Sequence, residues 1–276
     1  MPIVLNIAFA TLIGSDIQRL ERLERSIGRS DCPAIYTKRD DLMGLGGGGN
    51  KLRKLEFLIG DALAQGCDTF ITTGTRQSNH ARLSAAAAAC AGLACELVLT
   101  DTVSRDDEAY RRNGNVLLDD LFGATVHRRL AGADALEVAR ERAAELSTSG
   151  RRAYVVGSGG SSPVGCLGYA ACADEILMQE RDLGMSFGRI VVPNGSSGTH
   201  AGLAAGLKAM GDEPSRVMSF TVLAPLAKAL EAIRDLASAT LTLLDPAKEI
   251  ADGDIVMSVA NWAMATAFQL ARCSRR

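Results

Sequence analysis

The 276-residue sequence is poor in aromatic side chains, in histidine and in net charge. Aromatic residues make up 4% of the chain, there are 3 histidines, and the formal net charge is −2. Proteins that bind nucleic acid usually carry a basic surface and aromatic platforms for bases, so this composition argues against a nucleic-acid partner. Hydrophobic residues make up 47% and charged residues 22%, which is typical of a chain that folds around a core.

Long hydrophobic runs and paired cysteine motifs are also missing. The longest apolar runs, such as Leu83 to Leu93, are too short to span a bilayer, and the first residues lack the pattern of a signal peptide. The 7 cysteines show no C-x-x-C spacing, and most stand in apolar segments, where a free thiol behaves as a small hydrophobic group. We therefore expect a cytoplasmic protein with no metal site and no membrane partner.

Glycine, by contrast, is plentiful, and four of the 28 glycines stand in a row from Gly46 to Gly49, directly before Asn50 and Lys51. Glycine accepts positive φ and allows a bulky group to approach the backbone closely. Apolar residues then recur at helical spacing, which predicts a helix beginning near Lys51. The unpaired N–H groups and the dipole of a helix start disfavour the positive charge of a lysine placed there. The amine is then kept neutral and nucleophilic, as Schiff-base chemistry requires. The alternative is a solvated lysine before a surface helix.

Short apolar stretches alternate with amphipathic ones along the rest of the chain. Strands are expected at 34–37, 69–72, 95–99, 125–126, 153–156, 189–192 and 217–222. Helices are expected at 15–27, from 51 onward, and at 80–91, 107–121, 134–146, 163–180, 199–210 and 226–238. We expect the strand at 153–156 to open a second series of elements. The alternation predicts an α/β fold of mostly parallel sheets with helices on both faces.

Glycine-rich and hydroxyl-rich turns follow three of these strands, at the sheet edge where α/β proteins bind ligands. One of them joins a strand to a helix and consists of Gly195, Ser196, Ser197, Gly198 and Thr199. Its backbone N–H groups, hydroxyls and helix dipole suit a phosphate. The Walker pattern is missing, which disfavours a nucleoside triphosphate, and a plain turn with an N-cap is the alternative.

The other two turns offer different groups. Ser78, Asn79 and His80 provide a hydroxyl, an amide and an imidazole for a small polar ligand, although Ser78 is also a typical N-cap residue. Gly157 to Ser161 forms the third turn. If the strands are parallel, all three turns lie at one edge.

Several of these motifs together resemble a known family. They are Lys38–Asp41, Gly48–Phe57, Gln77–His80, Asn113–Asn115, Gly159–Ser161 and Gly195–Leu203. They resemble the D-cysteine desulfhydrase and 1-aminocyclopropane-1-carboxylate deaminase family, pyridoxal-phosphate enzymes of the tryptophan-synthase-β fold type (fold type II). The resemblance runs from about Ile35 to about Val256.

The resemblance implies roles for individual residues. Lys51 would hold the cofactor covalently, its neighbour Asn50 would also belong to the cofactor site, and Asn79 would bond the 3′ oxygen of the pyridoxal. The turn from Gly195 to Thr199 would hold the phosphate. Ser78 and His80 would act on the substrate, by positioning its carboxylate or assisting proton transfer. The deaminase branch usually has glutamine in place of His80, so the likeness favours the desulfhydrase side, whereas Arg76 stands where the family usually has a small or aliphatic residue.

A two-domain lyase follows as an expectation from the resemblance. Residues 1–47 with 161–276 would form a large domain that binds the cofactor phosphate, and 48–160 a smaller inserted one. The expected reaction is β-elimination from a small amino acid such as D-cysteine, giving pyruvate, ammonia and sulfide. The alternatives are 1-aminocyclopropane-1-carboxylate deamination, or a truncated cofactor-binding protein with little or no turnover. A homodimer is implied by the resemblance alone.

The end of the sequence departs from the family. Relatives continue for several more elements beyond the position of Val256, whereas here Trp262 to Leu270 leads only to Arg276. Back-translation allows a frame that begins at the last base of the Asn261 codon to read Leu-Gly-Asp-Gly-Tyr-Gly-Val-Pro-Thr, as relatives do. We therefore expect a frameshift and missing C-terminal elements, with a natural short helix from about 262 to 272 as the alternative.

Overall fold

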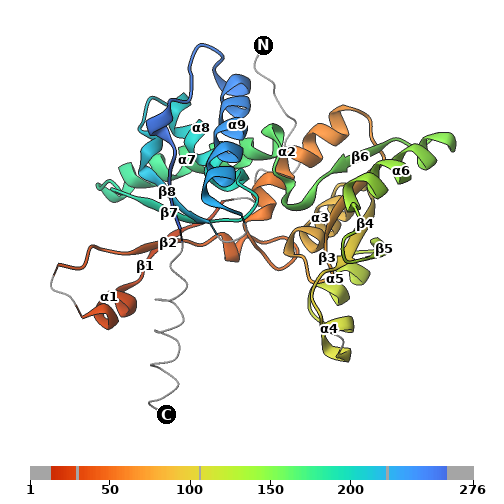
Figure 1. The fold of residues 1–276 in the computed structure, drawn as a ribbon. Coiled ribbons are helices and arrows are strands. Elements are labelled where there is room, and N and C mark those ends of the chain that lie inside the picture. Colours follow the sequence, from red (N-terminus) through yellow and green to blue (C-terminus); the bar gives the residue numbers. More distant parts are fainter. Residues whose placement is uncertain (1–13, 29–30, 106, 222–223, 260–276) are drawn as a thin grey trace.

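The computed structural model describes residues 14–28, 31–105, 107–221 and 224–259, and it contains two parallel sheets (Figure 1). The first sheet has the strand order β5-β4-β3-β6, and all its neighbours pair in parallel. Its strands are β3 (Thr69–Thr75), β4 (Ala94–Asp101), β5 (Thr125–Leu130) and β6 (Ala153–Val156). The expected α/β class is thereby confirmed.

Helices cover both faces of this first sheet. Five helices belong to this part of the chain: α2 (Lys51–Ala64), α3 (Asn79–Cys90), α4 (Glu108–Arg112), α5 (Asn115–Leu121) and α6 (Ala135–Thr148). On one face, apolar residues of α2 and α3 pack against Phe70 and Leu97. On the other, α6 packs against Ile71 and Val98. Successive side chains along a strand point to opposite faces of the sheet, and here the side chains on both faces are apolar. Helices therefore cover both faces.

The second sheet has the order β7-β8-β9, again parallel. It consists of β7 (Ile190–Asn194), β8 (Val217–Thr221) and β9 (Val256–Val259). Its helices are α7 (Pro163–Leu183), α8 (Gly198–Ala209) and α9 (Leu226–Leu244). Apolar residues of α7 and α8 pack against Ile190, Val192 and Val217. On the opposite face, Val191 and Pro193 of β7 are exposed.

An antiparallel pair precedes the first sheet, formed by β1 (Ile17–Arg19) and β2 (Tyr36–Lys38) with α1 (Glu21–Ile27) between them. The single helix predicted for 15–27 is therefore wrong at its start. Its first residues pair with β2, and α1 buries no residue. Such a short strand forms only through pairing with a partner about 20 positions away. The local pattern of apolar residues cannot reveal this partner.

Two further predictions need correction, and one strand was missed. The helix predicted for 107–121 is two helices, because Asn113 is extended and Gly114 has a φ of 64°. The strand at 153–156 opens no new series, since it pairs with β3 and completes the first sheet. Strand β9 was not predicted. The remaining regular elements are single turns of 3-10 helix, η1 (Asp40–Leu42), η2 (Ser158–Gly160), η3 (Pro214–Arg216) and η4 (Asp252–Asp254).

Helices α2 and α7 join the two sheets. A Cβ on Gly168 of α7 would come 1.8 Å from the backbone oxygen of Arg53 on α2, so only glycine permits this approach. Arg53 is 2% exposed and forms ion pairs with Asp40 at 2.8 Å and Glu175 at 2.7 Å. All strands of the first sheet lie within 48–160, the range predicted for the smaller domain. The division into two domains itself stays a prediction. Among the described helices, none is long and apolar enough to cross a membrane.

Candidate active site

The turn η2, which follows β6, brings the predicted site residues together. A Cβ on Gly159 would lie 3.9 Å from Cε of Lys51 and 2.8 Å from Oγ of Ser196. A Cβ on Gly160 would lie 3.3 Å from Cε1 of His80. These two glycines have positive φ, and they lie between the start of α2, the start of α3 and the turn before α8. Turns that are far apart in the sequence thus meet at one place.

Lys51 is the first residue of α2, as the sequence predicted. Its Nζ donates to Oδ1 of Asn50 at 3.1 Å, a neutral partner that leaves the amine free to lose its proton. Burial lowers the pKa of Lys51. Desolvation disfavours the charged form, so the amine is a better nucleophile than a solvated lysine.

Lys54, one helical turn further, is a site residue that the sequence reasoning missed. It is 1% exposed, and its Nζ donates to the backbone oxygen of Gly159 at 3.1 Å and to Oγ of Ser161 at 2.9 Å. Burial lowers its pKa to about 8, and the charge of Lys51 acts in the same direction. No carboxylate pairs with this ammonium among the described residues. Its position three residues after Lys51, on the same helix face, was the available signal.

The turn between β7 and α8 has an open helix N-terminus. No side chain caps α8, whereas Oγ of Ser78 caps α3 by accepting from the Ala81 N–H at 3.1 Å. Ser197 has a φ of 66°, a left-handed conformation that is rare outside glycine. The Gly198 N–H donates to the backbone oxygen of Ser196 at 2.8 Å, so the N–H groups of Thr199 and His200 are the ones left for an anion.

Side chains from both sheets complete this turn. Oγ of Ser196 lies 2.8 Å from Oγ of Ser161, which in turn binds Lys54. A Cβ on Gly198 would come 2.6 Å from Nζ of Lys54 and 2.6 Å from Oγ of Ser161, so a side chain here would displace both groups. Backbone N–H groups, hydroxyls and one buried ammonium converge here, and this donor set fits a phosphate group. Thr199, the next residue, is half-buried.

His80 is buried and its tautomer follows from its partner. Its Nε2 lies 2.8 Å from Oγ1 of Thr72, whose single hydroxyl proton goes to the backbone oxygen of Val156 at 2.9 Å. Nε2 must therefore donate, which leaves Nδ1 as an acceptor, without a partner among the described residues. Burial, followed by the charges of Lys51 and Lys54, lowers the pKa of His80 to about 3. The imidazole is neutral at physiological pH.

Arg76 is occupied within its own part of the fold. Its Nε and Nη2 donate to the two carboxylate oxygens of Asp101 at 2.8 and 2.7 Å, and its guanidinium lies over the ring of Tyr110. A bidentate pair of this kind is strong and geometrically specific. Arg76 therefore has a structural partner at the end of β4, despite its place just before Ser78.

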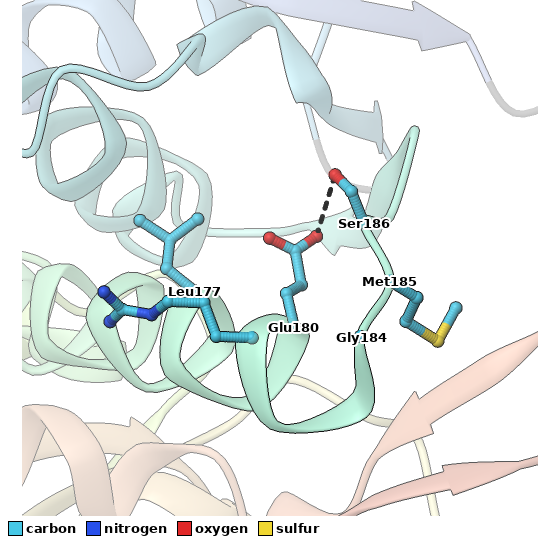
Figure 2. A pocket seen from close by; sticks show the side chains of 6 residues that line it. Leu177, Glu180, Gly184, Met185 and Ser186 are labelled. Carbon is cyan, nitrogen blue, oxygen red and sulfur yellow. Dashed lines mark hydrogen bonds between the residues drawn. The ribbon is translucent and has the colours of Figure 1, made fainter.

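A separate surface hollow lies at the end of α7, and Lys51 is not among its lining residues (Figure 2). Its lining includes Arg181 and the carboxylate of Glu180, which pairs with Arg216 and accepts from the Phe187 N–H and the Ser186 hydroxyl. Because these partners already satisfy the carboxylate, the hollow offers no free carboxylate for catalysis. Among the described residues, no group of three potential ligands could hold a metal ion.

Comparisons with known proteins agree with this arrangement. A family profile described as pyridoxal-phosphate dependent enzyme matches residues 12–272. The chain is 47% identical over 199 residues to a D-cysteine desulfhydrase of Serratia proteamaculans, which covers 71% of this chain and 59% of that protein. It is 43% identical over 232 residues to a protein of Pyrococcus abyssi provisionally named 1-aminocyclopropane-1-carboxylate deaminase, covering 83% of this chain and 66% of that protein.

The solved structures show the same likeness. The crystal structure of a homologue of 1-aminocyclopropane-1-carboxylate deaminase superposes with a TM-score of 0.75 at 36% identity, over 89% of this chain and 71% of that one. A bacterial threonine deaminase gives a TM-score of 0.60 at 22% identity, over 92% of this chain and 79% of that one, and shows the fold alone. The chain thus spans less than two thirds of the length of the curated relatives it matches.

Proposed function

The chain belongs to the pyridoxal-phosphate dependent enzymes, and on that premise we propose that it catalyses β-elimination from a small amino acid such as D-cysteine. With one water consumed, D-cysteine would give pyruvate, ammonia and hydrogen sulfide. The observation that carries the proposal is Lys51 at the start of α2, with a neutral hydrogen-bond partner and a pKa lowered by burial. Such an amine can bind a carbonyl carbon and exchange a proton with the substrate.

The residues around Lys51 fit the cofactor. The open turn of Gly195, Ser196, Ser197, Gly198 and Thr199 would hold the phosphate, and the Lys54 ammonium would balance its charge. Asn79 would bond the phenolic oxygen of the pyridoxal, and Asn50 would orient Lys51. When bound, the cofactor supplies an electron sink for the charge left at Cα.

The side chains at the two helix starts would handle protons. Nζ of Lys51 would take the Cα proton, because burial disfavours its charged form at rest. Nδ1 of His80 is an acceptor, so it would face a donor group of the cofactor or substrate and not a carboxylate. Oγ of Ser78 already accepts from the Ala81 N–H, so its hydroxyl proton remains available to donate to a substrate carboxylate.

Two other functions are supported by particular observations. Ring opening of 1-aminocyclopropane-1-carboxylate is supported by the likeness to a homologue of that deaminase at 36% identity. Cofactor binding with little turnover is supported by the second sheet, where Val191 is 62% and Val259 is 57% exposed. The predicted frameshift near Asn261 bears on the same alternative, but it lies outside the described residues.

We further propose a cytoplasmic homodimer with the two-domain division given above. The support is the resemblance of the motifs, together with the two separate sheets joined through α2 and α7. Sedimentation of the purified chain measures the dimer: a monomer at all concentrations up to those used for assay would contradict it.

A pair of assays tests the reaction. The purified chain with pyridoxal phosphate is incubated with D-cysteine and, separately, with 1-aminocyclopropane-1-carboxylate. We expect sulfide and pyruvate from the first substrate in equal amounts, and no 2-oxobutyrate from the second. The opposite pattern would favour the deaminase, and no product from either would favour cofactor binding alone.

A further inference from the structure

The loop between α4 and α5 is bonded to the turn before α3. Nε2 of Gln77 donates to the backbone oxygens of Tyr110 and Asn113, both at 2.8 Å, and its Oε1 accepts from the Asn115 N–H at 2.9 Å. Gly114 has a φ of 64°, and a Cβ there would lie 2.9 Å from Oε1 of Gln77. The loop therefore fits against this turn in one arrangement only.

Backbone groups determine which way each amide in this contact points. Nδ2 of Asn115 donates to the backbone oxygen of Gln77 at 2.8 Å. A carbonyl oxygen only accepts, so this atom of Asn115 must be its nitrogen. The second hydrogen of the same nitrogen goes to the side chain of Asn79 at 2.9 Å, and the atom that receives it must be the Asn79 oxygen.

The nitrogen of the Asn79 amide is the end that remains. Nδ2 of Asn79 has no hydrogen-bond partner within the described parts of the chain, and the side chain is exposed at the start of α3. Its neighbour His80 contacts the turn that also reaches Lys51. Asn79 thus presents two N–H donors, and no acceptor, beside the proposed cofactor site.

We propose that Asn115 is a positioning residue, which holds the Asn79 amide so that only its N–H donors face the site. The partner it selects is an oxygen that carries negative charge, such as the phenolic oxygen of pyridoxal. This inference rests on the proposed function. A hydrogen bond to a charged oxygen stabilises the charged form, so it weakens that oxygen's hold on a shared proton. The bound chromophore should therefore lose its proton at a lower pH than it would without the donor.

The substitution Asn115→Asp tests this inference. It nearly keeps the shape but replaces the donor by an acceptor, so the Asn79 amide must turn its nitrogen towards residue 115 and its oxygen towards the site. We expect the midpoint pH of the lysine-linked chromophore to rise by about one unit. The affinity for pyridoxal phosphate should fall about ten-fold, because a hydrogen bond to a charged group is lost.

Asn113→Asp is the matched control, since it places the same charge two residues away and keeps the backbone oxygen that Gln77 binds. Asn113→Asp should raise the midpoint pH of the chromophore by less than about half of the rise caused by Asn115→Asp, because solvent screens an exposed charge. Asn115→Ala provides a second variant should Asn115→Asp not fold, as judged by circular dichroism. It frees the Asn79 amide to rotate and should raise the midpoint by about half a unit.

The outcomes separate this inference from the proposed function. Suppose that the wild-type chain forms a lysine-linked chromophore and that both Asn115 variants titrate at the same midpoint pH. This result would overturn the inference and leave the proposed function standing. A wild-type chain that forms no such chromophore would overturn both. A rise in both variants that exceeds the Asn113→Asp shift supports the positioning role.

Discussion

Both sheets of this protein are parallel, but their strands differ in burial. In the first sheet, six consecutive residues of β3 and six of β4 are buried, as expected for parallel strands covered on both faces. In the second, burial alternates along β7, and Val191 on its outer face is 62% exposed. The lysines lie beside the closed sheet, whereas the phosphate turn begins at the end of an open one. We therefore expect turnover to depend on residues beside the first sheet, and cofactor affinity to depend on residues of both sheets.

The largest effect should come from Lys51, in the closed region. Lys51→Ala should abolish the lysine-linked chromophore and reduce turnover by at least about 10³-fold, within the range of a positioned general base. Absorbance and sulfide release measure the two effects. Lys228→Ala, which removes an exposed lysine of α9, is the matched control and should leave both unchanged. Equal losses in the two variants would contradict the assignment of Lys51.

Lys54 sharpens the comparison because it joins the two regions. Lys54→Met keeps the apolar stem and removes the ammonium that lies beside Gly198. We expect the dissociation constant for pyridoxal phosphate to rise about 10- to 100-fold, as for the loss of a charged hydrogen bond of about 1.5–3 kcal/mol. Lys208→Met, whose ammonium pairs with Asp254 at 2.9 Å, is the control on α8. Unchanged affinity in Lys54→Met would place the phosphate elsewhere.

A pair of valines compares the two sheets directly. Val98 on β4 is 0% exposed and Val191 on β7 is 62% exposed. Val98→Ala should lower the free energy of unfolding by about 2 kcal/mol through lost burial and a cavity. Val191→Ala should change it by less than about 0.5 kcal/mol. Urea denaturation measures both, and similar losses would show that the outer face of β7 is covered in solution.

Asp119 predicts a pH dependence in the closed region. It is 1% exposed, neither carboxylate oxygen has a partner among the described residues, and burial raises its pKa from 3.8 to about 7. The folded chain then binds more protons than the unfolded one between these values, so the stability that Asp119 contributes should fall as pH rises from about 4 to about 7.

Asp119→Asn removes the buried charge. It should raise the free energy of unfolding at pH 8 by about 1 kcal/mol or more, because the charged form is buried without a hydrogen bond. It should have a much smaller effect near pH 4, where the carboxyl holds its proton in the folded chain and the pH is close to the unfolded pKa of 3.8. Thermal unfolding at both pH values measures the difference. A variant that is less stable at pH 8 would show that Asp119 has a partner when charged.

The sequence predicted the parts of this site that depend on local chemistry. The helix start at Lys51 was predicted from the glycines that precede apolar residues at helical spacing. The N-cap of α3 was predicted from the residue type of Ser78. What it missed depends on distant contacts. Lys54 stands on the same helix face as Lys51, but its burial was not predictable, because it depends on contacts with Gly159 and Ser161, more than 100 positions away. Likewise, β1 is a strand only because β2 pairs with it.

The fold class was predictable and the topology was only partly so. Alternating strands and helices indicate parallel sheets whatever their order. The assignment of β6 to the first sheet depends on its pairing with β3, which no pattern within 153–156 reveals. The break between α4 and α5 had a visible signal in Gly114, which takes positive φ there.

The most direct test of this account is to identify the lysine that binds the cofactor. The chain loaded with pyridoxal phosphate is reduced with borohydride, digested and analysed by mass spectrometry. We expect the pyridoxyl mass on the peptide that contains Lys51, and on no peptide that contains Lys38, Lys208, Lys228 or Lys248 instead. Fragmentation within the Lys51 peptide must separate it from Lys54. A label on Lys54 or on any other lysine would contradict the central claim.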